Sequence, residues 1–280
     1  MGTSAQKHAR QKDRRSRLEQ AQAEMDRRAG RRRLLTGLGA GLAVVALILG
    51  IVAMVGGGGT KDSSADGSST TLASTTTVKD AATLPTPPEG LTITEPNPCP
   101  PAAGSAKRVQ KFAGPPPTCI DPAKKYSATF DTTEGSFTAD LDPGRAPVSV
   151  NNFVVLSRYH FYDGVPFHRI VPDFVIQAGD GDGDPWGNND LGYSIPDELP
   201  ASSDEYKDFS LAMANAGPDT NGSQFFVVLP GGGPKLNPAN YSLFGQVTQG
   251  QDVVTKIGTY ANGEAPTKAV VIKSVTINES

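Results

Sequence analysis

Cysteine and histidine are scarce in this 280-residue sequence. It contains only two cysteines and three histidines, and His8, His160 and His168 lie apart from the cysteines and do not cluster. A structural zinc site takes about four Cys or His ligands held close together. The composition therefore predicts no metal site.

Charged side chains are missing from one long stretch near the N-terminus. The run from Leu34 to Val55 holds 22 residues without a charge, and a helix of that length spans about 33 Å, enough to cross a bilayer. Arg31, Arg32 and Arg33 precede it and no basic cluster follows, so the positive-inside rule predicts a cytoplasmic N-terminus. We expect an uncleaved signal anchor in the cell membrane, with the rest of the chain extracytoplasmic. A cleavable signal peptide is the alternative, although its apolar region would be shorter.

Residues 1–33 form a basic tail. They hold 11 Lys or Arg against 4 Asp or Glu, a net charge of +7 that leaves −10 on the remainder. No aromatic side chain is interleaved for stacking on bases, so we expect no nucleic-acid partner. The tail is interpreted as a topology signal that touches anionic lipid headgroups.

Residues 56–98 lack the apolar side chains needed for a core. Four glycines are followed by Ser and Thr runs and then by proline-rich segments, a composition typical of a disordered linker. Residues 99–124 are an extension of intermediate character. Its cysteines, Cys99 and Cys119, would form a disulfide in an oxidising compartment, worth about 3 kcal/mol on the chain-entropy model. Two unpaired thiols are the alternative.

From residue 125 to 280 the pattern is that of a mainly β domain. Apolar residues alternate in 126–130 and again in 137–141, with a Thr-Thr-Glu-Gly turn between them, which predicts a hairpin. Further strands are expected near 209–214, 225–229, 243–247 and 270–277. Helices are expected from Pro147 to Tyr159 and around Val253 to Ile257. Many short strands with few helices indicate a closed barrel.

Two blocks carry a specific resemblance. They read FHRIVPDFVIQAGD at 167–180 and MANAGPDTNGSQFF at 213–226, and they resemble the two signature segments of the cyclophilins, a family of peptidyl-prolyl cis/trans isomerases. The resemblance extends from Lys125 to about Glu279. It implies an eight-stranded antiparallel barrel capped by two helices, preceded here by the transmembrane helix and the linker.

Isomerisation of an X-Pro bond makes and breaks no covalent bond. It passes through a twisted amide against a barrier of roughly 18 to 20 kcal/mol, so it needs only a site that binds this twisted form best. No metal, nucleophile or other cofactor is required. A fixed cation can donate to the twisted nitrogen and to the carbonyl, and the resemblance assigns this role to Arg169.

The resemblance also assigns the rest of the site. Gln177 would orient Arg169, and Phe174 would hold the proline ring beside them. The substrate-binding positions are the remaining matches in the two blocks and in the segment that follows them: Val175, Ala214, Asn215, Gln224, Phe226, Leu236 and Tyr241. His168 beside Arg169 is interpreted as structural, because bond rotation needs no general base.

One residue departs from the cyclophilin pattern, and one acidic segment resembles a calcium-binding loop. Lys235 occupies a position where the family often has a Trp that contacts cyclosporin, so we expect weak cyclosporin binding. Asp180, Asp182 and Asp184 resemble the start of a calcium loop but lack its glycine and glutamate. We expect no calcium there.

These observations predict an isomerase that assists the folding of exported or surface proteins. Its partners would be proline-containing peptides, unfolded exported proteins and the membrane. The alternative is a membrane-tethered proline-binding module or scaffold with little turnover.

Overall fold

The computed structural model describes residues 80–183, 186–187 and 191–280. The predicted basic tail at 1–33, the predicted anchor from Leu34 to Val55 and the linker up to residue 79 lie outside these ranges. In the described part of the chain, no helix has both the length and the apolar character needed to cross a bilayer. The membrane anchor therefore stays a prediction.

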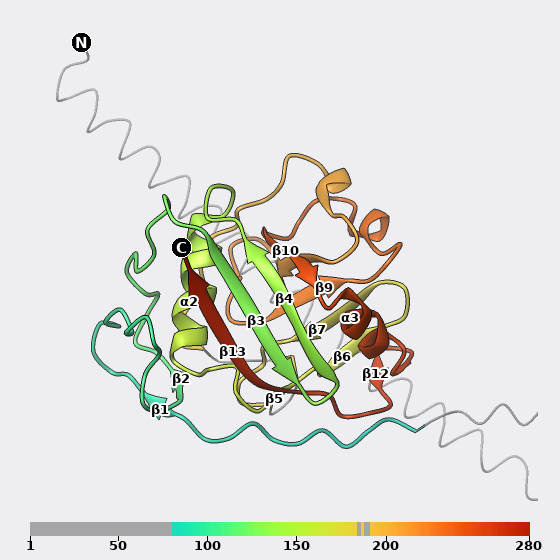
Figure 1. Ribbon diagram of the computed structural model, residues 1–280, viewed down its shortest axis with the longest axis horizontal. Coiled ribbons are helices and arrows are strands. Elements are labelled where there is room, and N and C mark those ends of the chain that lie inside the picture. The colour runs from blue at the N-terminus through green and yellow to red at the C-terminus, as the bar shows by residue number, and fades with distance from the viewer. Residues whose placement is uncertain (1–79, 184–185, 188–190) are drawn as a thin grey trace, which may run out of the picture. The chain divides into compact units, whose positions relative to one another are not determined.

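One curled sheet dominates the fold, and two α-helices and two small two-stranded sheets are arranged around it (Figure 1). Its strands in chain order are β3 (Tyr126–Thr132), β4 (Gly135–Leu141), β5 (Val165–Pro166), β6 (Arg169–Val171), β7 (Val175–Ala178), β8 (Ser210–Met213), β9 (Phe225–Val228), β10 (Leu243–Gln249) and β13 (Val271–Glu279). All pairings within this sheet are antiparallel. The mainly β prediction is confirmed.

The predicted number of strands and the closed barrel are wrong. The sheet has nine strands rather than eight, in the order β5-β13-β3-β4-β10-β8-β9-β7-β6, and its end strands are not paired with each other. β5 is only two residues long and ends in Pro166, which has no N–H to extend the pairing. At the other end, the amide of Ile170 in β6 donates to the carbonyl of Glu264 at 3.1 Å. A hairpin of β11 (Ala261–Asn262) and β12 (Ala265–Pro266) thus takes the place of a closing strand.

The hairpin predicted at the start of the domain is present. Its strands β3 and β4 pair from Tyr126 and Leu141 to Thr132 and Gly135. Burial alternates along β3, as expected for a strand with one face in the core. On that face the rings of Phe130 and Phe137 stack with centroids 4.5 Å apart.

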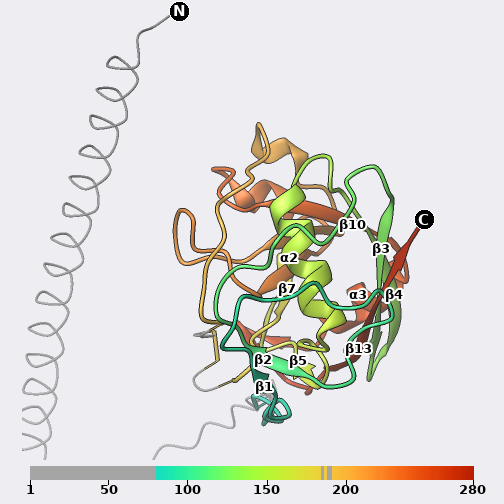
Figure 2. The same ribbon diagram turned by 90° about the vertical axis from the view of Figure 1, so that its left-hand side faces the viewer.

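Two α-helices cover the sheet, as predicted. α2 (Pro147–Arg158) begins at a proline, which suits the first helical position, and packs against β13. α3 (Gln251–Gly258) buries Val254 and Ile257 and packs against β4, β6 and β7. Figure 2 shows α2 lying across one face of the sheet. Two 3-10 helices, η1 (Ser203–Glu205) and η2 (Gly233–Leu236), lie in the loops before β8 and β10.

The two faces of the sheet carry separate apolar clusters. Alternate residues such as Ile176, Phe225 and Val227 belong to the main core with α2. Their neighbours Val175 and Phe226 point the opposite way, into a smaller cluster on the outer face. Because side chains alternate along a strand, one short segment contributes to both clusters. The outer cluster carries the site described below.

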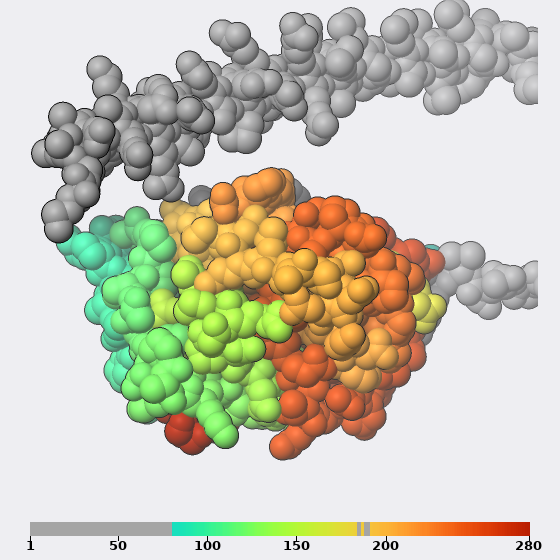
Figure 3. Space-filling view, turned by 90° about the horizontal axis from the view of Figure 1, so that it is seen from above, coloured from blue at the N-terminus to red at the C-terminus, as the bar shows by residue number. Residues whose placement is uncertain are grey.

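The segment from residue 80 to 98 differs from the expected flexible linker. Its β1 (Leu91–Thr92) pairs in parallel with β2 (Val109–Lys111). The amide of Ala82 donates to the carbonyl of Pro266 at 2.7 Å. Figure 1 shows the segment running past β5 to β1, and Figure 3 shows it joining the surface of the domain. Composition alone did not indicate this, because the segment is held by backbone hydrogen bonds and by the burial of Pro87, while Pro85 and Pro88 stay exposed.

The extension carries a disulfide, and one buried asparagine of α2 binds it. Cys99 and Cys119 are joined, which is the pairing that the sequence favoured. The side chain of Asn151 in α2 accepts from the amide of Cys119 at 2.7 Å and donates to the carbonyl of Pro117 at 2.9 Å. The extension is therefore a structural part of the domain.

Arg108 is the main polar link between the extension and the sheet. It donates to the carbonyls of Phe161 and Gly181, both at 3.0 Å, and to that of Pro88. Its guanidinium also lies over the Phe161 ring, 5.6 Å from the centroid. Burial removes water from the Arg108 guanidinium and lowers its pKa. The carbonyls take the place of the lost water as hydrogen-bond acceptors.

We expect Arg108→Ala to lower the free energy of unfolding by about 3 kcal/mol, because several buried carbonyls lose a charged donor. Urea unfolding of the variant and the parent measures this. Arg145→Ala is the matched control, since Arg145 forms an exposed pair with Glu205 and should cost about 1 kcal/mol or less. Equal losses in the two variants would contradict the role given to Arg108.

Candidate active site

The register of four neighbouring strands brings two of the predicted catalytic residues, Arg169 and Gln177, into one row with the predicted substrate-binding residue Phe226. Arg169 in β6 pairs with Gln177 in β7, and Gln177 pairs with Phe226 in β9. Phe226 in turn pairs with Ala212 in β8. Paired residues of antiparallel strands direct their side chains to the same face of the sheet. The row therefore lies on the outer face, away from the main core.

A tight turn between β6 and β7 places Phe174 next to this row. Pro172 and Asp173 occupy its centre, Asp173 has a φ of 52°, and the amide of Phe174 donates to the carbonyl of Val171 at 3.2 Å. A proline followed by a residue with positive φ is the pattern of a type II turn. The turn leaves Phe174 half-buried and Val175 buried in the outer cluster.

Arg169 is held from two sides. Its Nη1 donates to Oε1 of Gln177 at 3.3 Å, while Nε and Nη2 donate to the two carboxylate oxygens of Glu264 at 2.9 and 3.0 Å. These bonds to Arg169 lower the pKa of Glu264 below its usual value, which keeps the carboxylate ionised. Gln177 also donates from Nε2 to Oε1 of Gln224 at 2.9 Å. A chain of side-chain bonds thus runs from Glu264 to Gln224.

The apolar residues predicted to hold the proline ring lie together in the outer cluster. Phe226 and Tyr241 meet edge to face with ring centroids 5.2 Å apart. The hydroxyl of Tyr206 donates to the carbonyl of Tyr241 at 2.7 Å and fixes this segment. The predicted members of the cluster are Phe174, Val175, Ala214, Phe226, Leu236 and Tyr241.

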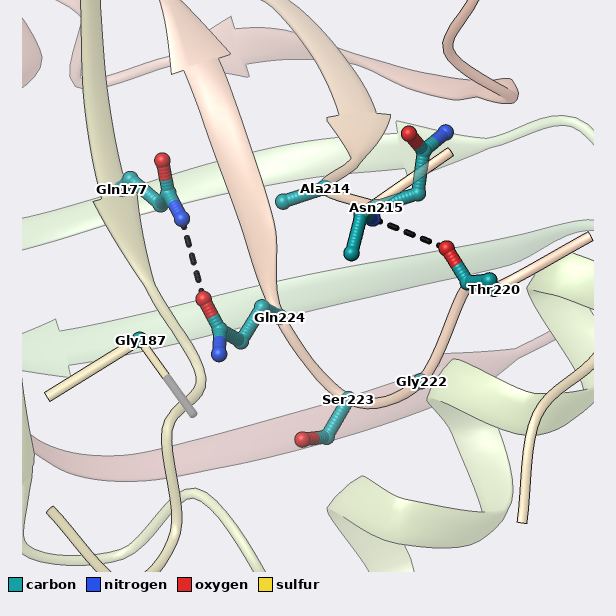
Figure 4. A pocket seen from close by; sticks show the side chains of 9 residues that line it. Gln177, Gly187, Ala214, Asn215, Thr220, Gly222, Ser223 and Gln224 are labelled. Atoms are coloured by element: carbon teal, nitrogen blue, oxygen red, sulfur yellow. Dashed lines mark hydrogen bonds between the residues drawn. The ribbon is translucent and has the colours of Figure 1, made fainter. Parts of the chain in front are cut away.

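A polar hollow of about 220 Å³ lies beside the apolar cluster. Figure 4 shows Gln177 and Gln224 bonded to each other on one side and Ala214 and Asn215 on the other. The side chain of Asn215 donates to the carbonyl of Asn240 at 2.8 Å. All four are predicted site residues, and Ala214 also contacts the apolar cluster.

The helix η2 packs closely against the backbone of Phe174 and Tyr206, at the edge of the apolar cluster. A Cβ added to Gly232 would lie 2.3 Å from the carbonyl oxygen of Phe174, and one added to Gly233 would lie 2.1 Å from that of Tyr206. Only glycine allows so close an approach. The following residues bring Leu236 into the cluster and leave Lys235 exposed at its rim.

Lys235 contacts residues at the edge of the outer apolar cluster. Its ammonium donates to the carbonyl of Asp173 at 2.7 Å and lies 6.0 Å from the centroid of the Phe174 ring. The position where a Trp was expected by resemblance thus holds a cation over an aromatic ring. The lysine side chain covers part of the Phe174 ring, but it cannot supply the N–H donor of an indole.

The structure adds functional candidates that sequence reasoning missed. Glu264 was not singled out, and it lies 95 positions from Arg169, to which it is bound. Tyr206 and the bond between Gln177 and Gln224 were missed as well. No local motif marks these partners, because they meet only through the pairing of distant strands.

His168 is a stacked side chain beside the site. Its ring lies parallel to that of Trp186, with centroids 6.0 Å apart and an interplanar angle of 10°. Burial, together with the positive charge of Arg169, lowers the His168 pKa to about 4. The imidazole is therefore neutral at neutral pH.

The acidic segment after β7 is organised around a buried carboxylate. Asp180 accepts from the amides of Gly183, at 3.0 Å, and of Gly187. Among the described residues, no group of three His, Cys, Asp or Glu could hold a metal ion, and Asp184 lies outside them. Asp180 acts as a turn-stabilising acceptor.

The lowered pKa of His168 makes a prediction about stability. The unfolded chain binds a proton near pH 6.5 and the folded chain only near pH 4, so the stabilisation is complete above pH 6.5 and is lost as the pH falls toward 4. The loss should reach about 3 kcal/mol. Urea unfolding between pH 7.5 and 4 should show a shallower decline for His168→Phe, which keeps a flat ring against Trp186. Parallel curves for parent and variant would rule the effect out.

Comparison with known proteins agrees with this geometry. The family described as cyclophilin type peptidyl-prolyl cis-trans isomerase/CLD matches residues 127–277. Peptidyl-prolyl cis-trans isomerase-like 1 of Aspergillus oryzae is 41% identical over 137 residues, covering 48% of this chain and 84% of that protein. The probable peptidyl-prolyl cis-trans isomerase A of Mycobacterium leprae is 40% identical over 171 residues, covering 54% and 92%.

A solved structure shows the same fold. The crystal structure of a cyclophilin type peptidyl-prolyl cis-trans isomerase from Cryptosporidium parvum is 26% identical, covers 56% of this chain and 99% of its own, and superposes with a TM-score of 0.50. The chain belongs to the cyclophilin-type peptidyl-prolyl cis-trans isomerases and is an enzyme of that class.

Proposed function

We propose that this isomerase acts on X-Pro bonds of exported and surface proteins and that Arg169 stabilises the twisted amide. The observation that carries the proposal is the row of Arg169, Gln177 and Phe226 across β6, β7 and β9. It sets a cation, an amide that orients it, and an apolar surface side by side. A proline and its peptide bond need these three features in this proximity.

The reaction requires stabilisation of a form that differs from the substrate mainly in one torsion. Twisting removes the amide resonance, so the nitrogen becomes a stronger hydrogen-bond acceptor while the carbonyl still requires a donor. A donor fixed at that place binds the twisted form better than either planar form, which is the condition for catalysis. One such donor lowers a barrier by about 3 to 4 kcal/mol.

Arg169 can donate to a substrate while it keeps its hydrogen bonds to Gln177 and Glu264. A guanidinium has five N–H groups, and within the described residues three of them bond to Gln177 and Glu264. One N–H on each terminal nitrogen is left for a peptide. Its side chain is 31% exposed, so a substrate can reach it.

The proline ring would be held by the apolar cluster next to Arg169. Phe174, Ala214 and Tyr241 form its partly exposed edge, and Phe226 and Leu236 form its floor. Gln224 and Asn215 would bond the substrate backbone in the polar hollow, whose size suits one or two residues. Fixing the ring while the preceding segment turns is the task of such a pocket.

Location outside the cytoplasm is supported by the disulfide between Cys99 and Cys119, because such bonds persist in oxidising compartments. The apolar run from Leu34 to Val55, preceded by three arginines, would hold the domain at the cell membrane. We expect the substrates to be unfolded exported proteins.

The main test is the exchange rate of an Ala-Pro peptide, measured by NMR with the full chain in detergent. We expect the parent to accelerate exchange and Arg169→Ala to lower kcat/KM by about a hundredfold, because a donor worth about 3 kcal/mol is lost. Gln177→Ala should lower it less, since it removes only one of the two supports of the guanidinium.

Unfolding curves of the same variants show whether each one is folded. A folded parent that binds the peptide but gives no acceleration would favour a proline-binding module with little turnover. An Arg169→Ala variant as active as the parent would show that the catalytic donor is another group.

Lys235 should also determine the response to cyclosporin. Its ammonium covers the edge of Phe174, where an indole would add an aromatic surface and an N–H donor. We expect weak binding by the parent and at least about tenfold tighter binding by Lys235→Trp, a gain of about 1.4 kcal/mol. Titration calorimetry measures this, with Lys235→Ala as the control for loss of the cation. Equal affinities for all three proteins would remove Lys235 as the cause.

A further inference from the structure

We infer that Glu264 is a positioning residue of the active site, whose carboxylate fixes one edge of the Arg169 guanidinium so that the opposite edge faces the substrate groove. The inference rests on the proposed role of Arg169. It goes further by assigning a function to a residue outside the two sequence blocks that define the site.

The contact between the two side chains is a two-point one. Nε and Nη2 of Arg169 each donate to a different oxygen of Glu264, at 2.9 and 3.0 Å. Parallel bonds of this kind fix the plane of a guanidinium as well as its position. The single 3.3 Å bond from Nη1 to Gln177 is longer and cannot do this alone.

The backbone holds Glu264 in place for this contact. It lies in the turn between β11 and β12, directly after Gly263, which has a φ of 63°. Its own carbonyl accepts from the amide of Ile170, next to Arg169 in β6. The same backbone bond that covers the edge of the sheet thus sets the distance between the two side chains. On the far side of the hairpin, the carbonyl of Pro266 accepts from the amide of Ala82 in the segment 80–98.

The geometry favours positioning over obstruction. Glu264 binds the edge formed by Nε and Nη2, whereas Gln177, which lines the groove, is bound through Nη1. The remaining N–H groups belong to the two terminal nitrogens. A carboxylate that competed with the substrate would instead occupy the edge between these nitrogens.

A positioning role and an obstructing role predict opposite changes in kcat/KM when Glu264 is removed. If Glu264 orients Arg169, its removal lets the guanidinium turn and lowers kcat and kcat/KM together, because the lost interaction acts in the transition state. If Glu264 obstructs the site, its removal raises kcat/KM. The charge it contributes is 69% exposed, so the effect should be modest, about threefold to tenfold.

The experiment compares kcat and kcat/KM of the full chain in detergent with those of Glu264→Ala, Glu264→Gln and Glu264→Asp, for the Ala-Pro peptide. We expect a threefold to tenfold loss for Ala, a smaller loss for Gln and partial recovery for Asp. Asp131→Ala is the matched control, since it removes an exposed carboxylate paired with Lys273 at 3.4 Å on a distant strand. It should leave the rates unchanged.

A spectroscopic measurement separates positioning from a general structural effect. The Nε–H signal of Arg169, assigned by its absence in Arg169→Lys, should exchange faster with solvent in Glu264→Ala and stay unchanged in Asp131→Ala. In an Arg169→Ala background, Glu264→Ala should add no further loss of activity.

The outcomes keep the two proposals apart. Unchanged or increased activity in Glu264→Ala overturns the positioning role, even if Arg169→Ala is inactive. An active Arg169→Ala variant overturns the proposed catalytic role of Arg169 itself. A loss in Glu264→Ala that persists in full without Arg169 also overturns the inference, because Glu264 would then act through another group.

Discussion

The antiparallel register of β6, β7 and β9 is the constraint on which the site depends. It sets Arg169 opposite Gln177 and Gln177 opposite Phe226, so that cation, orienting amide and apolar floor share the outer face. The alternate residues Ile170, Ile176 and Phe225 fill the main core behind them. A shift of one residue in either pairing would exchange the two faces and bury the arginine. Stability of the core and placement of the site are therefore consequences of the same pairing.

Much of this could be predicted from the sequence, and the parts that could not have a common cause. Period-two alternation located the hairpin of β3 and β4, and the two blocks located the row of site residues. Strands of two or three residues, such as β5 and β6, carry too few positions to show any period. The predicted count of eight strands came from the family resemblance, and the periodicity of such short strands could not correct it. Glu264 escaped notice because its partnership depends on a hairpin that folds back over a sheet edge, which no local pattern encodes.

Two charged side chains contact the site at its rim. Lys235 lies over Phe174 at one place, and Glu264 binds Arg169 at another. Neither alters the apolar floor. The segment 80–98 contributes through the bond from Ala82 to the β11–β12 hairpin, and the extension contributes through the three carbonyls bound by Arg108. Residues that precede the nine-stranded sheet are thus connected to the hairpin whose Glu264 binds Arg169.

The measurement that tests the account most directly is the position of a bound Ala-Pro peptide, found by NMR from contacts between its proline ring protons and the protein. The account predicts contacts with Phe226, Leu236 and Phe174, together with a shift of the Arg169 guanidinium signals. Contacts confined to the polar hollow around Asn215 and Thr220, with unchanged Arg169 signals, would contradict it.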